Sequence, residues 1–99
     1  MEQSNDIKKN LLPIKFLCEE YKDIEKKTFY YEPNLTVSEM LSRFKYETRI
    51  EKECEGELGS DLIFIYKGIV LYNDHTPLKD KFKNDDSIQI IIQVHYRVG

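Results

Sequence analysis

Apolar and polar residues alternate along two stretches of the chain, and this alternation predicts β-strands. In residues 61–67 every second side chain is large and apolar, and Ile63 and Ile65 lie on the opposite face of the strand. In residues 87–94 four aliphatic side chains share one face, and Ile91 lies on the other face between two glutamines. One face of each strand belongs to the core. The other face is too apolar for ordinary contact with solvent.

Three further strands complete the β-pattern. Lys67-Gly68 forms a tight turn after the first stretch, and the short apolar run 69–71 returns as the second arm of a hairpin. Nearer the N-terminus, residues 12–19 alternate as a half-buried strand. Residues 27–32 then resume aromatic and β-branched content before Pro33 ends the ladder. The polar residues between these two strands predict a second hairpin with a loose tip.

One helix is predicted to begin at Thr36. Thr36 and Glu39 have the spacing of a capping box, and Leu35 and Met40 have the spacing of a hydrophobic staple. A single apolar stripe then runs along the helix, and it consists of Val37, Met40, Leu41 and Phe44. We therefore expect an amphipathic helix that packs one face on a sheet.

The segment after this helix is acidic. Residues 47–60 contain five glutamates, two glycines and the isolated apolar residues Ile50 and Leu58, which predicts a frayed helix end and a long acidic loop. A single short helical turn is predicted between Leu78 and Phe82, ahead of the last strand.

The order of these elements predicts an α+β fold. Two strands, one helix and then further strands favour a mixed sheet of four to five strands wrapped over the amphipathic helix. The last strand is expected at the centre of the sheet, beside the first. Because 99 residues have room for one modest core, we predict a single domain, residues 11–99. Residues 1–10 carry Ile7 as their one apolar side chain besides Met1, which predicts a flexible N-terminal arm.

Three segments resemble ubiquitin-like proteins: residues 63–71, Thr76-Pro77-Leu78 and residues 85–90. Their spacing is most similar to that of the SUMO branch, and the resemblance covers about residues 12–94. It implies the ubiquitin-like β-grasp fold, which does not by itself specify a function. The C-terminal Arg97-Val98-Gly99 is similar to the end of the mature ubiquitin-fold modifier.

Charge and composition narrow the classes of partner. The formal net charge is -3 with both signs mixed along the chain, which argues against a nucleic-acid site. The first residues are polar and acidic, and no apolar stretch reaches 18 residues, so we expect no targeting peptide and no membrane span. We expect a soluble monomer of the cytoplasm and/or the nucleus, with Cys18 and Cys54 as free thiols.

Motifs for catalysis and metal binding are missing from the sequence. Cys18, Cys54, His75 and His95 do not have metal-ligand spacing, and no glycine-rich phosphate loop occurs. Some β-grasp domains hold iron–sulfur clusters, but two cysteines cannot supply the four ligands of a cluster. We therefore expect no enzyme, no cofactor and no metal.

The predicted binding surface is an apolar patch on the outer face of the sheet. The resemblance to ubiquitin places the patch at Tyr21, Ile65 and Ile91, and the strand pattern adds Ile63 and reaches Ile65 and Ile91 independently. Contiguous exposed apolar surface is typical of an interaction site. The alternative is that the N-terminal arm or the acidic loop covers these isoleucines.

A second candidate surface follows from the resemblance to SUMO alone. SUMO proteins bind extended peptides along the groove between the second strand and the helix, where basic residues support acidic peptide motifs. Here the corresponding positions are Tyr30 and Glu32, so that electrostatic support is missing.

Two functions remain open. The first is a non-catalytic domain that binds proteins, namely enzymes or receptors of ubiquitin-like pathways. The second is a stand-alone modifier conjugated through Gly99; a sulfur carrier needs the same flexible terminal glycine. A modifier requires residues from His95 onward to be mobile, whereas in an embedded domain Tyr96 is expected to pack back on the sheet. Ubiquitin and SUMO end in Gly-Gly, where this chain has Tyr96-Arg97.

Overall fold

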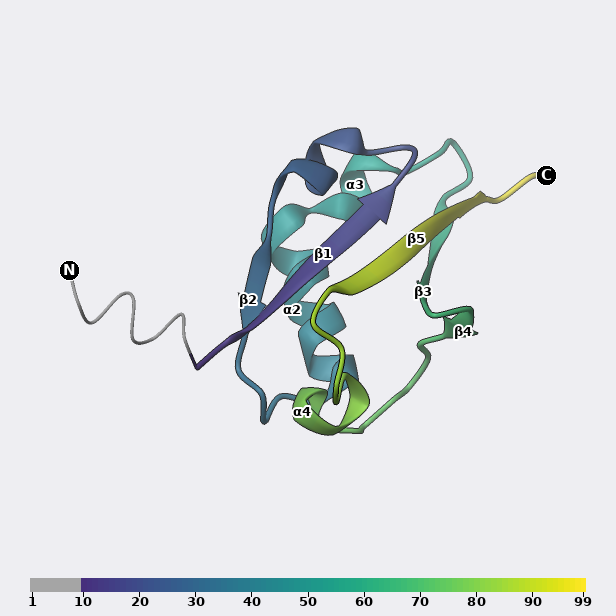
Figure 1. The fold of residues 1–99 in the computed structure, drawn as a ribbon. Helices are drawn as coiled ribbons and strands as arrows, with labels where there is room; N and C mark the ends of the chain where they lie inside the picture. The colour runs from purple at the N-terminus through teal and green to yellow at the C-terminus, as the bar shows by residue number, and fades with distance from the viewer. Residues whose placement is uncertain (1–9) are drawn as a thin grey trace.

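The computed structural model describes residues 10–99 and contains five strands and four short or medium helical segments over that range (Figure 1). In chain order the elements are β1 (Leu12–Cys18), the 3-10 helix η1 (Lys22–Lys26), β2 (Phe29–Tyr31), α2 (Val37–Thr48), α3 (Ile50–Glu53), β3 (Ser60–Tyr66), β4 (Ile69–Val70), α4 (Leu78–Lys81) and β5 (Ile88–Tyr96). The predicted flexible arm, residues 1–10, lies outside the described residues except for Asn10.

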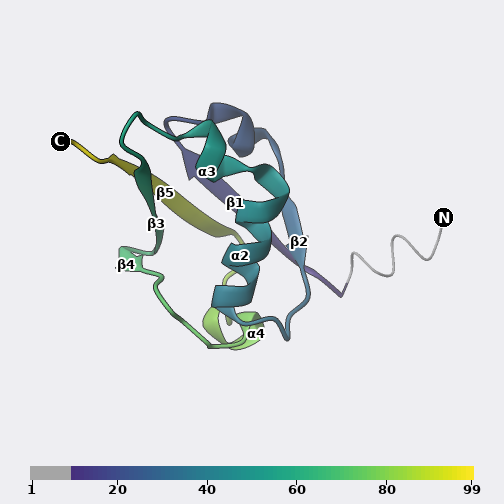
Figure 2. The ribbon, with the colours of Figure 1, turned by 180° about the vertical axis from the view of Figure 1, so that it is seen from behind.

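The strands form one mixed sheet in the order β2-β1-β5-β3-β4. β1 and β5 pair in parallel at its centre, and each of the other neighbouring pairs is antiparallel. Figure 2 shows α2 lying across one face of this sheet. The predicted α+β architecture, with the last strand beside the first, is confirmed. β5 runs two residues further than expected and ends at Tyr96.

Aromatic rings hold α2 against the sheet. The ring of Phe44, on α2, stacks on that of Phe16, on β1, with centroids 3.8 Å apart. The rings of Phe29 and Phe64 lie edge-on to that of Phe44, with centroid distances of 5.1 and 6.0 Å. Because α2 places its apolar stripe on this cluster, Val37, Met40 and Phe44 are fully buried, as the sequence pattern predicts.

The start of α2 is fixed by hydrogen bonds to its own side chains and to a distant loop. The predicted capping box is present: the Glu39 N–H donates to Thr36 Oγ1, and the Thr36 N–H donates to the Glu39 carboxylate. The Ser38 N–H also donates to the Asp74 carbonyl. The Asp74 carboxylate in turn accepts from the Thr76 N–H at 2.9 Å and lies 2.8 Å from Lys81 Nζ. These bonds tie the 74–81 segment to the helix start.

The expectation of one long acidic loop over residues 47–60 is wrong for its first half. α2 ends at Thr48, Arg49 adopts a left-handed conformation with φ 55°, and α3 follows at once. The reason is burial: Ile50 is fully buried and Cys54 nearly so, and these two side chains draw the segment onto the core. Similarly, the predicted loose hairpin tip contains η1, whose Ile24 is buried.

No helix within residues 10–99 is both long enough and apolar enough to cross a bilayer.

Truncation of core side chains is expected to destabilise the fold strongly. Met40→Ala and Phe64→Ala each remove a large side chain that is no more than 5% exposed, so each should cost roughly 2–5 kcal/mol. Tyr46→Ala, on the solvent side of α2 and 85% exposed, is the matched control and should change stability little. Urea unfolding followed by circular dichroism measures all three. Unchanged stability in either core variant would contradict the strand and helix faces described here.

Asp74 is expected to make stability depend on acid pH. The hydrogen bond from Lys81 lowers the pKa of Asp74 to about 2. Since this pKa lies below the unfolded value near 4, the stabilisation is complete above about pH 4 and is lost as the pH falls from there through 2. Asp74→Asn should cost roughly 1–2 kcal/mol at pH 7, and the difference from the unsubstituted protein should shrink towards pH 2. Urea unfolding at pH 7, 4 and 2 measures it; a constant difference would count against the ion pair.

Candidate protein-binding face

An apolar row crosses the outer face of the sheet, opposite α2. The strand register pairs Leu17 with Ile91, Ile91 with Ile65, and Ile65 with Val70. Cross-strand partners project to the same side of a sheet, so these four side chains form one line over β1, β5, β3 and β4. We call Leu17, Ile91, Ile65 and Val70 the outer-face row.

Two of the four side chains in the outer-face row are about half exposed. Ile91 is 48% exposed and Val70 is 54% exposed, while Leu17 and Ile65 are half-buried by their neighbours. Ile63 lies two residues before Ile65 on the same face of β3, opposite Gln93, and is also half-buried. Ile91 keeps its exposure with all of residues 47–60 in place, so the acidic segment does not bury it. Residues 1–9 of the N-terminal arm, the other expected cover, lie outside the described residues. The row is therefore a small open apolar surface on a rigid sheet.

The structure brings together three of the four residues expected in the patch. Ile63, Ile65 and Ile91 lie on adjacent strands of the outer face. Tyr21, at the start of η1, is half-buried and packs against the core cluster, and the register does not connect it to the row. Leu17 and Val70 were missed. Leu17 is an apolar residue at a position of the strand alternation that faces away from the core. The same pattern identified Ile63, Ile65 and Ile91.

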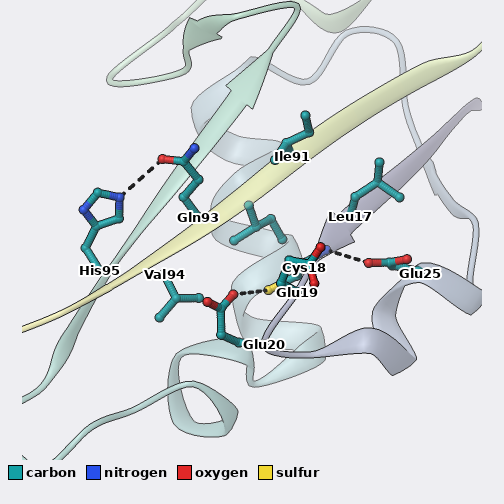
Figure 3. A pocket seen from close by; sticks show the side chains of 10 residues that line it. Leu17, Cys18, Glu19, Glu20, Glu25, Ile91, Gln93, Val94 and His95 are labelled. Carbon is teal, nitrogen blue, oxygen red and sulfur yellow. Dashed lines mark hydrogen bonds between the residues drawn. The ribbon is translucent and has the colours of Figure 1, made fainter.

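A groove opens at one end of the row, where β1 stops and β5 continues (Figure 3). Its volume is 470 Å³. Apolar side chains from both strands line it, together with carboxylates from the turn after β1 and from η1; they include Leu17, Ile91, Val94, Glu19, Glu20 and Glu25. Leu17 and Ile91 point to the same side in Figure 3, as the register requires.

The two thiols near this groove are not poised for chemistry. Cys18 and Cys54 are free and almost fully buried. Burial raises the pKa of Cys54 to about 11, and it also raises the pKa of Cys18. Both sulfurs are therefore protonated near neutral pH, which is the inert state of a cysteine.

The C-terminal strand is held against the loop before β3. The Arg97 N–H donates to the Gly59 carbonyl at 3.0 Å, and the Arg97 guanidinium lies 2.7 Å from the Asp61 carboxylate. The ring of Tyr96 lies over Gly56, where an added Cβ would come within 2.8 Å of it. His95 and Tyr96 thus belong to β5 and not to a free tail, and Val98, 91% exposed, lies beyond it.

Comparison with known proteins identifies the fold. No protein-family model matches the chain, and no curated protein matches it. Among solved structures, the crystal structure of ATG8 from Trypanosoma brucei is similar, with a TM-score of 0.63 and 19% sequence identity over 99% of this chain and 84% of that one. The fold is a ubiquitin-like β-grasp. At this identity the likeness extends to the fold alone, and it does not support the SUMO branch or the ubiquitin-fold modifier.

In this ubiquitin-like fold, an ion pair joins α2 to the end of β2, where the resemblance to SUMO predicts a peptide-binding groove. Arg43 of α2 lies 3.2 Å from the carboxylate of Glu32, just after β2. Tyr30 is 41% exposed on β2, and its register partner is Pro13. Because Glu32 neutralises the nearby Arg43, this groove offers little attraction to an acidic peptide.

Proposed function

We propose that this chain is a non-catalytic protein-binding domain with a ubiquitin-like fold, bound by its partners through the outer-face row. The observation that carries the proposal is the alignment of Leu17, Ile91, Ile65 and Val70 across four strands, with Ile91 about half exposed. Removing these apolar side chains from water favours binding. A rigid sheet also loses little conformational entropy when a partner covers it.

The surroundings of the row support a protein as the partner. Its polar neighbours on β1 and β5 are Lys15, Gln89, Gln93 and His95. An apolar centre with a polar rim is the usual anatomy of a protein interface, whereas a nucleic-acid site needs a cationic surface and the chain carries net charge -3. The partners we propose are enzymes or receptors of ubiquitin-like pathways, bound by a monomer. Free thiols fit a reducing compartment, so we place the protein in the cytoplasm and/or the nucleus.

The test uses Ile91. Ile91→Asp puts a charge in the middle of the row and should weaken partner binding at least tenfold, because a carboxylate buried against apolar groups is left unpaired. Ser42→Asp is the matched control: it introduces the same charge at an exposed position of α2, on the opposite side of the sheet from the row. Proteins captured from a lysate by the unsubstituted domain are purified, whether or not they bind the variants, and titrated directly against each variant.

Thermal unfolding accompanies this titration. Ile91→Asp should keep the melting temperature within a few degrees of the unsubstituted protein, since the side chain already faces solvent. Equal binding by Ile91→Asp and Ser42→Asp in a folded domain would overturn the proposal.

A second candidate function is a modifier conjugated through Gly99. The observation in its favour is that Val98 lies beyond β5 and is 91% exposed. Against it, Tyr96 and Arg97 are packed and hydrogen-bonded, whereas an activating enzyme must draw the last residues into its channel as an extended chain.

We therefore expect that incubation with ATP and the activating enzymes for ubiquitin, SUMO and the ubiquitin-fold modifier gives no thioester. Reducible adducts are scored by gel electrophoresis, with deletion of Gly99 as the control. A thioester that requires Gly99 would make the modifier the better description.

A further inference from the structure

One edge of the central strand β5 is left open by its neighbour. The parallel register of β1 and β5 ends at Cys18 opposite Ile92, but β5 continues to Tyr96. On its other side β5 stays paired with β3 to the end, where Tyr96 lies opposite Ser60. The last four residues of β5 therefore have a strand on one side only, within the part of the chain that the structure describes.

Two hydrogen bonds identify which backbone groups face the open side. The Arg97 N–H donates to the Gly59 carbonyl, towards the β3 side. The Phe64 carbonyl accepts from the Leu71 N–H and so points away from β5, although Phe64 lies opposite Ile92. Since backbone groups alternate in direction along a strand, odd-numbered residues of β5 bond to β3. The N–H and C=O of Val94, and the N–H of Tyr96, face the open side.

The chain after β1 does not fill this space. The Cys18 N–H donates to the Glu25 carboxylate at 3.2 Å, and the Cys18 carbonyl accepts from the Tyr21 N–H at 3.3 Å. Both groups thus bond towards η1, and the chain turns away from β5 at this point. The space left behind is the 470 Å³ groove of Figure 3. Among residues 10–99, no backbone hydrogen bond outside the strand ladders reaches Val94.

The side chains around the groove favour a cationic occupant. Glu19, Glu20 and Glu25 line it, and no lysine or arginine does. The charges that lie on the neighbouring η1 are mixed, and Lys22 already pairs with Glu19 at 3.3 Å in an exposed position. The Cys18 thiol donates a long hydrogen bond of 3.8 Å to the Glu20 carboxylate. These carboxylates keep lone pairs for a further donor.

We propose that this groove binds an extended segment of a partner protein, which adds to β5 as a short strand beyond the end of β1 and directs a lysine or arginine to Glu19 and Glu20. Backbone pairing to an exposed strand edge supplies affinity without a sequence requirement, and the carboxylates and apolar floor supply the preference for basic and aliphatic side chains. Four residues of β5 span about 13 Å, which is enough to pair with about four residues of an added strand. The inference deepens the proposed function by giving the chemistry of the partner at one end of the outer-face row.

The probe is a blocked hexapeptide of alternating valine and lysine, titrated into the ¹⁵N-labelled full chain. Before addition, the Val94 amide should exchange with solvent faster than the Gln93 and His95 amides, which face β3. On addition, amide resonances of Val94, His95 and Tyr96 should shift, and exchange at Val94 should slow at least fivefold. A peptide with glutamate in place of lysine should not bind.

Backbone N-methylation distinguishes strand addition from simple charge attraction. An added strand pairs through one edge, so methylating the amides of one alternate set should abolish binding and methylating the other set should preserve it. Glu19→Gln together with Glu20→Gln should weaken the lysine peptide at least fivefold. The matched control removes two charges elsewhere, by Glu51→Gln and Asp86→Asn, both at exposed positions, and should leave binding unchanged.

The outcomes separate this inference from the proposed function. If Ile91→Asp leaves partner binding intact but the lysine peptide still protects Val94, the outer-face proposal fails and the strand-edge proposal stands. Three results would overturn the strand-edge proposal: unchanged exchange at Val94, equal loss with both methylated peptides, or shifts at Val94 that grow with protein concentration in the absence of peptide. The last result would mean that the edge pairs with a second copy of this chain.

Discussion

The parallel pairing of β1 with β5 is the constraint on which the rest of this structure depends. It joins the first and last strands at the centre of the sheet, so neither can form a complete ladder until most of the chain is in place. Its register sets Phe16 beside Ile90 under α2, and on the opposite face it sets Leu17 beside Ile91. A shift of one residue would exchange the two faces. The same pairing thus specifies both the core and the candidate binding surface.

Local features of this fold could be predicted from the sequence because each depends on neighbouring residues. The capping box of Thr36 and Glu39, the apolar stripe of α2 and the alternation in β3 and β5 are all confirmed. They require only the periodicity of a helix or a strand. The placement of Ile65 beside Ile91 was also predicted, because the fold class sets their two strands side by side.

Features that arise between distant segments could not be predicted in this way. The helix α3 forms because Ile50 finds a place in the core, and nothing in its acidic neighbours indicates that place. The open edge of β5 depends on a difference in length between two strands. That difference in turn depends on the bond from the Cys18 N–H to the Glu25 carboxylate and the bond from the Tyr21 N–H to the Cys18 carbonyl. The ordering of Tyr96 and Arg97 depends on Gly56, Gly59 and Asp61, about forty positions earlier.

The burial of both cysteines gives the protein an internal reporter of its own motions. Cys18 ends the central strand β1, Cys54 is the C-cap residue just after α3, and the two thiols contact each other where the sheet meets the helical side. Each is at most 2% exposed and protonated, and an alkylating reagent can reach it only when that region opens. Because the two thiols contact each other, the rate of their modification measures how often the junction between the central sheet and α3 opens.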